Sequence, residues 1–338
     1  MSRSDQAVQQ DTMRAVVQDA YGSTDVLRTS RADVPVIADD EVLIRVHAAG
    51  VDRGTWHLMT GRPYLMRVIG FGFRRPKNRV PGLDVAGVVE AIGPKVTRFA
   101  VGDEVFGISR GSFAEFAAAK ESKLALKPAG ITYEQAAAVP VSASTAHQAL
   151  HLAGRLEPGQ KLLVNGASGG VGSYAVQLGK AHGAEVTGVA STAKLDFVRS
   201  LGADHVVDHT QPGDLPDRYD LILDIGGNTP LRRLRRALTP TGTIVFVGGE
   251  GGGNVTGGIG RGMRAALRSP FVRQRFVMMA AKERHDELEQ VAELIVAGSV
   301  TPAVERTYPL DGVAEALKHL EDGKARGKLV ITVLPQDA

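Results

Sequence analysis

The second half of the chain alternates between apolar runs and stretches of mixed polarity. Short apolar runs typical of buried strands lie at residues 162–164, 185–190, 206–207, 219–224 and 243–247. The stretches between them that have the spacing of amphipathic helices are residues 173–182, 192–201 and 230–238. Strands that alternate with helices of these lengths are typical of a doubly wound parallel sheet. The pattern therefore predicts an α/β domain in this part of the chain.

The first part of the chain has a different pattern. Short segments of alternating polarity, such as residues 41–47 and 86–92, are separated by turn-forming pairs that include Pro81-Gly82 and Gly93-Pro94. This texture predicts an all-β domain. Residues 327–333 form one more strand near the C-terminus, with no partner strand left around it. We expect that strand to complete the sheet of the first domain.

These patterns divide the chain into two domains and a tail. We expect residues 13–138 and 307–338 to form the β domain, and residues 139–306 to form the α/β domain. At 338 residues the chain is long enough for two such domains. Residues 1–12 are polar and lack an apolar core, which predicts a disordered tail rather than a signal peptide or an anchor.

A cluster of small residues follows the apolar run at 162–164 and opens the next helical stretch. The absence of a Cβ at Gly169 and Gly172 would let a ligand approach the free N–H groups of the helix start, which suits a pyrophosphate. The alternative is a tight turn without a ligand. Because the βαβ context is present, we predict a dinucleotide site made by Gly166, Ala167, Ser168, Gly169, Gly170, Val171 and Gly172.

Composition excludes several classes of function. A formal charge of +3 gives little reason to expect nucleic acid as a partner. No stretch approaches the roughly 20 apolar residues of a membrane span. The chain has no cysteine, which excludes disulfides, a thiolate nucleophile and zinc sites with sulfur ligands. The absence of cysteine also fits a cytoplasmic location.

Several spaced motifs together resemble the medium-chain dehydrogenase/reductase superfamily, and within it the zinc-free, quinone-reductase-like branch. The motifs are Ala49-Gly50-Val51, residues 81–89, residues 101–107, Ala138-Val139-Pro140 with Thr145-Ala146, residues 165–172 and residues 325–330. The resemblance covers nearly the whole chain. It implies a GroES-like β domain and a Rossmann domain of α/β class, with the active site in the cleft between them.

The residues at the zinc-ligand positions of this superfamily argue against zinc. Zinc alcohol dehydrogenases have a Cys soon after the Gly-Val turn and Gly-His-Glu where this chain has Gly82-Leu83-Asp84, and here the first of these positions is Asp52. An open catalytic zinc site needs at least three protein ligands. Without a Lewis acid to stabilise an alkoxide, alcohol oxidation is disfavoured. We therefore expect no metal and an acceptor that carries its own developing charge, a quinone or an enone.

Residues 52–57 replace the Asn-Pro-Val-Asp-Thr-Tyr of the quinone reductases, so that Asp52 stands for the Asn and His57 for the Tyr. We predict both as catalytic residues: His57 would donate to a developing enolate or quinol oxygen, and Asp52 would orient its neighbours. The alternative is that His57 is only a polar residue at the cleft edge. Trp56 and Tyr64 are candidate substrate contacts. The loop of residues 61–78 either shapes the acceptor pocket or covers the cleft from outside.

The resemblance also suggests the residues that surround a nicotinamide cofactor. Those near its ring are Thr145, Val247, Gly248, Gly249 and Lys328. NAD-specific Rossmann domains carry an acid about 20 residues beyond the glycine turn. This chain instead has Ser191, followed by Lys194, and His209 lies after the next strand. We predict that Ser191 and Lys194 hold a 2′-phosphate, with His209 near it, and that the cofactor is NADPH.

The sequence therefore predicts an NADPH-dependent oxidoreductase that transfers hydride to a small hydrophobic quinone or enone without zinc. The alternatives are a zinc-type alcohol dehydrogenase and a nucleotide-binding protein with no significant turnover. Residues 251–279 mix glycines, apolar residues and arginines, which fits a lid, a dimer contact or a helix on a membrane surface. We predict a homodimer paired through the strand Phe276-Val277-Met278-Met279.

Overall fold

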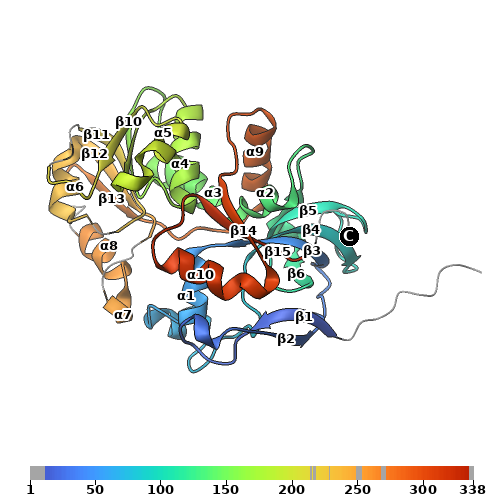
Figure 1. Cartoon of the computed structure of the whole chain (residues 1–338). Coiled ribbons are helices and arrows are strands. Elements are labelled where there is room, and N and C mark those ends of the chain that lie inside the picture. Colours follow the sequence, from blue (N-terminus) through green and yellow to red (C-terminus); the bar gives the residue numbers. More distant parts are fainter. Residues whose placement is uncertain are drawn as a thin grey trace, which may run out of the picture.

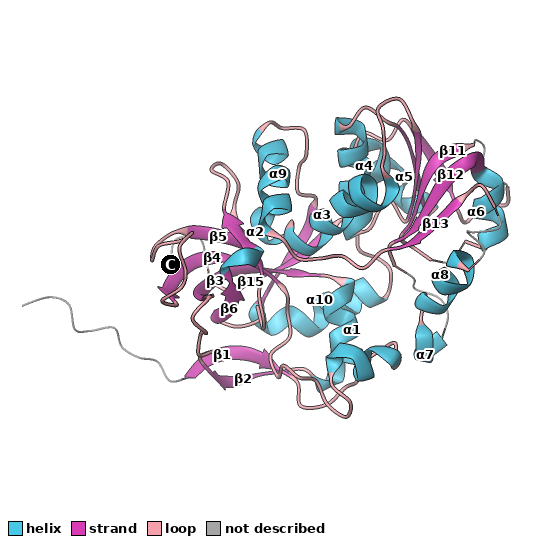
Figure 2. Ribbon diagram, turned by 180° about the vertical axis from the view of Figure 1, so that it is seen from behind, coloured by secondary structure: helices cyan, strands magenta, loops and turns pink. Residues whose placement is uncertain are grey.

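A computed structural model of the chain describes residues 12–213, 215, 218–227, 229–248, 253–267 and 272–334. Within these residues a domain rich in antiparallel strands lies beside a domain with a parallel sheet (Figures 1 and 2). The tail expected over residues 1–12 lies outside the described residues except for Thr12, and Gly249 lies outside them as well. The predicted limits of the two domains stay predictions.

The first domain contains two sheets of its own. Its larger, seven-stranded sheet follows the order β14-β15-β3-β4-β5-β7, with β6 also paired to β3. The strands of this sheet are β3 (Glu41–Val51), β4 (Asp84–Ile92), β5 (Glu104–Ile108), β6 (Phe116–Lys120), β7 (Leu124–Leu126), β14 (Val304–Pro309) and β15 (Lys328–Thr332). β15 pairs antiparallel with β3, which confirms that the last strand returns to the first domain. The smaller sheet pairs β1 (Thr12–Val17) with β2 (Arg28–Asp33).

Short helices and helical turns surround this sheet. The helices are α1 (Arg53–Thr60), α2 (Tyr133–Ala137) and α10 (Val313–Glu321). The helical turns are η1 (Thr24–Val26), η2 (Arg67–Phe71), η3 (Glu121–Lys123) and η7 (Leu310–Gly312). Val313 and Leu317 of α10 are fully buried and pack with Ile44 and Val46 of β3 in one apolar core. The helix that follows the Rossmann domain therefore belongs to the packing of the first domain.

The second domain is built on a six-stranded sheet in the order β10-β9-β8-β11-β12-β13. All five neighbouring pairs in this sheet are parallel among the described residues, which confirms the doubly wound sheet. Its strands are β8 (Lys161–Asn165), β9 (Glu185–Ala190), β10 (His205–Asp208), β11 (Tyr219–Asp224), β12 (Leu238–Phe246) and β13 (Arg275–Met278). Its helices and turns are α3 (Pro140–His147), η4 (Gln148–Gly154), α4 (Gly170–Ala181), η5 (Thr192–Lys194), α5 (Leu195–Ser200), α6 (Leu231–Ala237), α7 (Gly253–Thr256), α8 (Ile259–Ala266) and α9 (His285–Val296).

The apolar run at β8 is buried on both faces of the sheet. Leu162 and Val164 pack into the core under α3, α4 and α9, whereas Leu163 points to the core shared with α6 and α8. Successive side chains of a strand point to opposite faces. A continuous apolar run is therefore what a central parallel strand between two helical layers requires.

The segment expected to be a lid, a dimer contact or a membrane-surface helix forms α7 and α8, which lie beyond β12 and β13 on the side of α1 (Figures 1 and 2). Ala265 of α8 is buried in the core, and a Cβ at Gly262 would lie 2.9 Å from Met278 of β13. β13 is the last strand on its side of the sheet among the described residues. Its pairing with a second copy stays a prediction.

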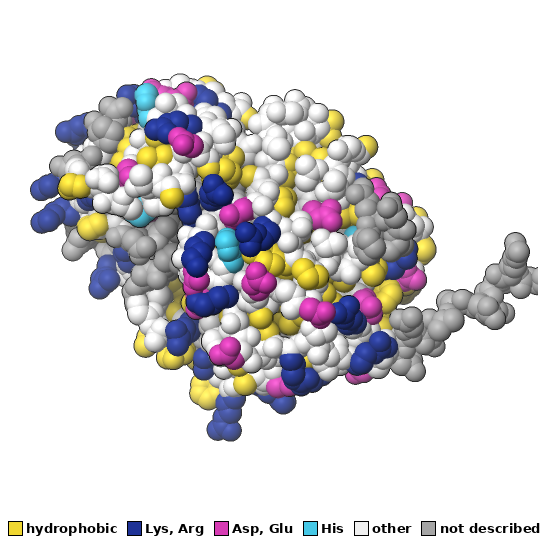
Figure 3. Space-filling view, viewed as in Figure 1, with side chains coloured by type: hydrophobic (Ala, Val, Ile, Leu, Met, Phe, Trp, Pro, Cys, Tyr) yellow, Lys and Arg dark blue, Asp and Glu magenta, His cyan; other side chains and the backbone are white. Residues whose placement is uncertain are grey.

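The surface agrees with the modest net charge of the chain. Figure 3 shows Lys and Arg side chains interspersed with Asp and Glu over the face that carries α10. No helix in the described part of the chain is both long and apolar enough to cross a membrane.

Candidate active site

The glycine-rich turn between β8 and α4 has the geometry that the sequence predicted. Gly166 has a φ of +94°, a conformation that glycine adopts without steric cost. A Cβ at Gly172 would lie 2.1 Å from the carbonyl oxygen of Gly166 and 2.7 Å from the Cα of Ala167. Gly169 is the N-cap of α4 and supplies no side chain there. The first N–H groups of α4 have no partner within the helix, and binding of a pyrophosphate by them stays a prediction.

A buried ion pair within the first domain lies against this turn. The Lys328 ammonium donates to Asp84 at 2.7 Å, and these side chains are only 1% and 0% exposed. Asp84 also accepts the backbone N–H of Val141, at the start of α3. Next to Lys328, the N–H of Gly327 donates to the carbonyl of Ser168 at 2.8 Å. The start of β15 in the first domain is thus bonded to the glycine-rich turn of the second.

The side chain of Lys328 has a partner other than a cofactor. Its Cδ lies 3.0 Å from the position of a Cβ on Gly170, so the aliphatic part of the side chain covers the start of α4. Complete burial raises the pKa of the Asp84 carboxyl, and the Lys328 ammonium acts in the opposite direction. Within this fold Lys328 closes the domain interface behind the turn, and its direct contact with a cofactor stays a prediction.

The residues predicted to hold a 2′-phosphate follow the ends of β9 and β10. Ser191 is the N-cap of η5 and makes no side-chain capping bond. The backbone N–H of His209 donates to the carbonyl of Ala190, which brings His209 beside the end of β9. Lys194 donates to the carbonyls of Gly323 at 2.6 Å and Ala325 at 2.7 Å.

Lys194 therefore ties η5 to the loop between α10 and β15. Burial lowers the pKa of its ammonium, while Glu305 acts in the opposite direction. These contacts to the other domain were not foreseen from the sequence, because the two carbonyl partners lie 129 and 131 residues away.

The carboxyl ends of β8 and β11 carry a polar network that the sequence analysis missed. Asn165 donates from its side-chain amide to Asp224 at 2.7 Å, and Asp224 is fully buried. The Arg261 guanidinium of α8 lies 2.6 Å from the other Asp224 oxygen. Burial raises the pKa of Asp224, whereas Arg261 and Asn165 lower it. The arginines of residues 251–279 were the only signal for this contact.

Of the residues expected near the nicotinamide ring, Val247 and Gly248 lie beside this network. Thr145 lies on α3, and its hydroxyl donates to the carbonyl of Val141 at 2.6 Å. The N–H of Val247 donates to the carbonyl of Asp224 at the end of β11. A Cβ at Gly248 would lie 3.0 Å from the carbonyl oxygen of Ile225, so β12 ends close to the turn that follows β11.

On the acceptor side, Asp52 is the N-cap of α1. One of its carboxylate oxygens accepts the N–H of Thr55 at 2.7 Å, which is the usual role of an Asp at this position. A Cβ at Gly54 would lie 3.0 Å from Asp52 and 3.4 Å from Leu83, so the two positions compared with zinc ligands are neighbours. Leucine has no donor atom for a metal. Among the described residues, no group of three His, Cys, Asp or Glu side chains has the geometry to hold a metal ion.

His57 and the aromatic candidates lie along α1 and the loop that follows it. The Nδ1 of His57 lies 2.8 Å from the carbonyl oxygen of Arg62, and the rings of His57 and Trp56 pack edge to face. Trp56 packs against the core of the first domain. Tyr64 is 41% exposed, and the Arg67 guanidinium lies over its ring.

An apolar pocket of about 340 Å³ lies beside these residues. Leu58 of α1, Leu83 and Phe71 contribute to its lining, as do further residues of the loop 61–78. His57, Trp56 and Tyr64 are not among its lining residues. The loop therefore shapes a pocket next to the end of α1.

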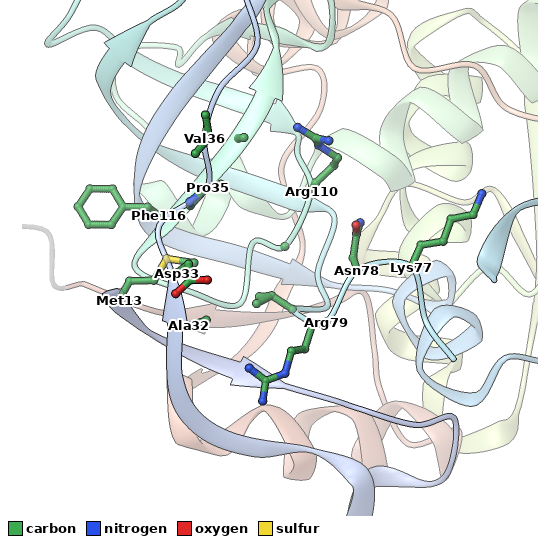
Figure 4. A pocket seen from close by; sticks show the side chains of 13 residues that line it. Met13, Ala32, Asp33, Pro35, Val36, Lys77, Asn78, Arg79, Arg110 and Phe116 are labelled. Atoms are coloured by element: carbon green, nitrogen blue, oxygen red, sulfur yellow. The ribbon is translucent and has the colours of Figure 1, made fainter. Parts of the chain in front are cut away.

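A second pocket, of about 390 Å³, lies on the outer side of residues 77–80 (Figure 4). Its lining includes Met13, Val36 and Phe116 together with Arg79 and Arg110. Both arginines are already paired, Arg79 with Asp19 at 2.6 Å and Arg110 with Glu41 at 2.7 Å. This pocket lies away from the cofactor turn.

Comparison with known proteins agrees with this architecture. Residues 38–129 match a family model described as alcohol dehydrogenase GroES-like domain, and residues 201–331 match one described as zinc-binding dehydrogenase. A 2-methylene-furan-3-one reductase of Solanum lycopersicum is 34% identical over 96% of this chain and 80% of its own length. A chloroplastic NADPH-dependent alkenal/one oxidoreductase of Arabidopsis thaliana is 36% identical over the same shares of the two chains.

Among solved structures, the quinone oxidoreductase from Coxiella burnetii superposes with a TM-score of 0.83. It is 25% identical, and the match covers 96% of this chain and all of that one. The chain belongs to the medium-chain dehydrogenase/reductase superfamily, in its quinone-oxidoreductase-like branch.

Proposed function

We propose that this chain is an NADPH-dependent oxidoreductase that reduces a quinone or an enone without zinc. The observation that carries the proposal is the glycine-rich turn, whose close backbone packing at Gly166 and Gly172 and position against the Lys328–Asp84 pair of the first domain support a dinucleotide site. The names of the two plant relatives, an enone-type reductase and an alkenal/one oxidoreductase, support the same class of reaction. The donor set at Asp52 and Leu83 supports a site without zinc.

A reduced nicotinamide, when bound, supplies the hydride. The residues of the chain bind and orient the reactants: the start of α4 holds the pyrophosphate, and Thr145 and Val247 border the ring. The apolar pocket beside Leu83 and Phe71 takes the body of a hydrophobic acceptor and excludes water from it. His57 donates a proton from its Nε2 to the acceptor oxygen as negative charge develops there. It can do so only as the imidazolium, because its Nδ1–H donates to the carbonyl of Arg62.

The test is NADPH oxidation, followed by absorbance, with a panel of quinones, enones and simple ketones. We expect turnover with quinones or enones and little with the ketones, which form an unstabilised alkoxide. Prolonged treatment with a chelator should leave this turnover intact. Loss of turnover that added zinc restores, or tight NADPH binding with no turnover on any acceptor, would contradict the proposal.

The preference for NADPH is tested at Lys194. A charged donor to a phosphate makes a strong hydrogen bond, so Lys194→Ala should raise KM for NADPH by roughly tenfold and leave KM for NADH unchanged. Ser191→Asp should shift the preference towards NADH, because a carboxylate binds the ribose 2′-hydroxyl and repels the phosphate. Lys180→Ala is the matched control, since Lys180 pairs with Asp204 outside the site.

Lys194 also bonds to Gly323 and Ala325, so its loss could loosen the domain interface without any phosphate being involved. That effect would be the same with either cofactor. Equal increases in KM for NADPH and NADH would therefore refute the phosphate-binding role of Lys194.

The role of His57 is tested by His57→Phe, which keeps a flat ring and removes the donor. If His57 donates to the acceptor, kcat/KM for the best acceptor should fall by roughly 100-fold while KM for NADPH is unchanged. Steady-state kinetics with each substrate varied in turn measures both quantities. Unaltered kcat/KM would show that solvent supplies the proton and that His57 is a polar residue of the cleft edge.

We also propose a homodimer and a cytoplasmic location. The position of β13 at the side of the sheet, with Phe276 and Met278 on it, supports pairing with a second copy along that strand.

A further inference from the structure

Helices α7 and α8 contact both domains, although their sequence position places them in the Rossmann domain. At the first end, the carbonyl of Asn254 in α7 accepts the N–H of Tyr64 at 2.7 Å. A Cβ on Gly257, which follows α7, would lie 3.4 Å from the ring of Pro63. Pro63 and Tyr64 open the loop that lines the apolar pocket, so α7 contacts the acceptor side of the cleft.

At the other end, Arg261 of α8 is bound to the cofactor side. Its guanidinium lies 2.6 Å from Asp224 and donates to the carbonyl of Gly227 at 2.6 Å and to that of Thr229. These groups belong to the end of β11 and the turn that follows it. A planar guanidinium can satisfy several acceptors at once, which an ammonium cannot do with the same geometry.

The turn after β11, which Arg261 binds, is in direct contact with the glycine-rich turn between β8 and α4. The N–H of Gly226 donates to the carbonyl of Asn165, and a Cβ on Gly166 would lie 3.0 Å from the nitrogen of Gly226. A shift of the Gly226 backbone would therefore displace Gly166, where the glycine-rich turn begins. In open α/β sheets, ligands bind at this edge, outside the carboxyl ends of the strands.

We propose that Arg261 is a positioning residue that couples the two halves of the active site. Through Asp224 it fixes the turn after β11 against the cofactor turn, and through α8 and α7 it holds the loop 61–78 beside the acceptor pocket. Arg261 touches neither reactant in this role. The effect of Arg261 on the NADPH site rests on the proposed function. Its effect on the loop 61–78, through α8 and α7, does not.

The hold on the loop is tested by limited trypsin digestion of the ligand-free chain. The loop contains the trypsin sites Arg67, Arg74 and Lys77, and cleavage after them is counted by the masses of the fragments. Arg261→Met should speed this cleavage by roughly tenfold, because proteolysis follows the population in which a segment opens locally. Arg261→Lys keeps a positive charge beside Asp224. Its rate of loop cleavage should lie between those of the unaltered chain and Arg261→Met.

Arg264→Met is the matched control. Arg264 lies on the same helix with an exposed side chain, and its replacement also removes one trypsin site from α8. Loop cleavage should be the same in Arg264→Met as in the unaltered chain. Equal cleavage rates in Arg261→Met, Arg264→Met and the unaltered chain would overturn the proposal.

Loss of Arg261 leaves the buried Asp224 charge without its partner, so Arg261→Met alone could unfold the domain. The double variant Arg261→Met with Asp224→Asn removes that charge. It should fold, as judged by circular dichroism, and show the same faster cleavage of the loop. A folded double variant with slow cleavage would also refute the proposal.

The coupling is tested by adding NADPH to the same digestions. NADPH should protect the loop in the unaltered chain and in Arg264→Met, and fail to protect it in the double variant even at saturation. If Arg261 only stabilised the fold, saturating NADPH would protect the loop in the double variant as well. If the unaltered chain bound no NADPH in a fluorescence titration, the proposed function would fail, while the ligand-free digestion would still decide the hold on the loop.

Discussion

Replacement of Lys328 by methionine is expected to lower the free energy of unfolding by about 3–5 kcal/mol, because it leaves a buried charge without its partner. Asp84 is 0% exposed, and Lys328 supplies the ammonium 2.7 Å from it. Methionine keeps most of the side-chain volume against Gly170, so the loss is mainly electrostatic. Urea unfolding followed by circular dichroism measures the difference.

The pH dependence of this loss has a definite sign. Burial raises the pKa of Asp84 above its unfolded value, and removal of Lys328 raises it further. At low pH the Asp84 carboxyl of the variant is neutral, and its burial lowers the free energy of unfolding only a little. Above the folded pKa of Asp84, the native state of the variant must bury an unpaired negative charge. The deficit of Lys328→Met should therefore be larger at pH 8 than at pH 5.

Lys324→Met is the matched control for this substitution. Lys324 is 67% exposed and pairs with Asp322 at the surface, and such pairs contribute about 0–1 kcal/mol. The double variant Lys328→Met with Asp84→Leu should recover part of the lost stability, since no charge is then buried. If Lys328→Met cost no more than Lys324→Met, the pair would not hold the domain interface as described.

Gly172→Ala is expected to weaken NADPH binding and to destabilise the chain together. Its Cβ would meet the carbonyl oxygen of Gly166 at 2.1 Å, so either the turn or the start of α4 must move. Overpacking of this kind costs about 1–3 kcal/mol, and a comparable loss in binding corresponds to roughly 5- to 150-fold in Kd. Thermal unfolding and NADPH fluorescence titration measure the two effects separately.

Gly169→Ala, in the same turn, separates the effect on NADPH binding from the effect on stability. A Cβ there has only the Gly166 carbonyl within 4 Å, at 3.7 Å, so the fold should accept it. The methyl group would nevertheless stand in the path of a pyrophosphate at the N-cap of α4. We expect unchanged stability with weaker NADPH binding. Equal losses of stability in Gly169→Ala and Gly172→Ala would contradict the backbone packing described for Gly172.

The sequence was sufficient for the features that depend on near neighbours along the chain. Leu162, Leu163 and Val164 predicted a strand of a doubly wound parallel sheet, and a run with no polar position suits the burial on both faces that the structure gives it. The turn from Gly166 to Gly172 followed from the same local pattern. Even the return of β15 to the first sheet could be inferred, because an unpaired strand must find a partner.

The roles of the charged residues could not be predicted in this way. Lys194 was expected to face a phosphate, which stays a prediction, and in the structure it donates to the carbonyls of Gly323 and Ala325. Arg261 was one of several arginines with no assigned role, yet it alone among them reaches the buried Asp224 in the described part of the chain. A flexible cationic side chain has no preferred partner along the sequence, so its partner depends on which distant groups the fold brings within reach.

The sequence by itself thus determined the two domains and the place of the dinucleotide turn, because strand burial and glycine backbone geometry are local properties that a pattern of residue types records. The tertiary structure alone decided what joins the two domains. Lys328 and Asp84 are 244 residues apart in the chain, and their pairing depends on β15 and β4 lying on either side of β3. Across the domain boundary, Asp84 then accepts the N–H of Val141, and Gly327 donates to the carbonyl of Ser168. Burial of a charge is acceptable only when a partner is fixed beside it, and that partner is supplied by the packing of the whole fold.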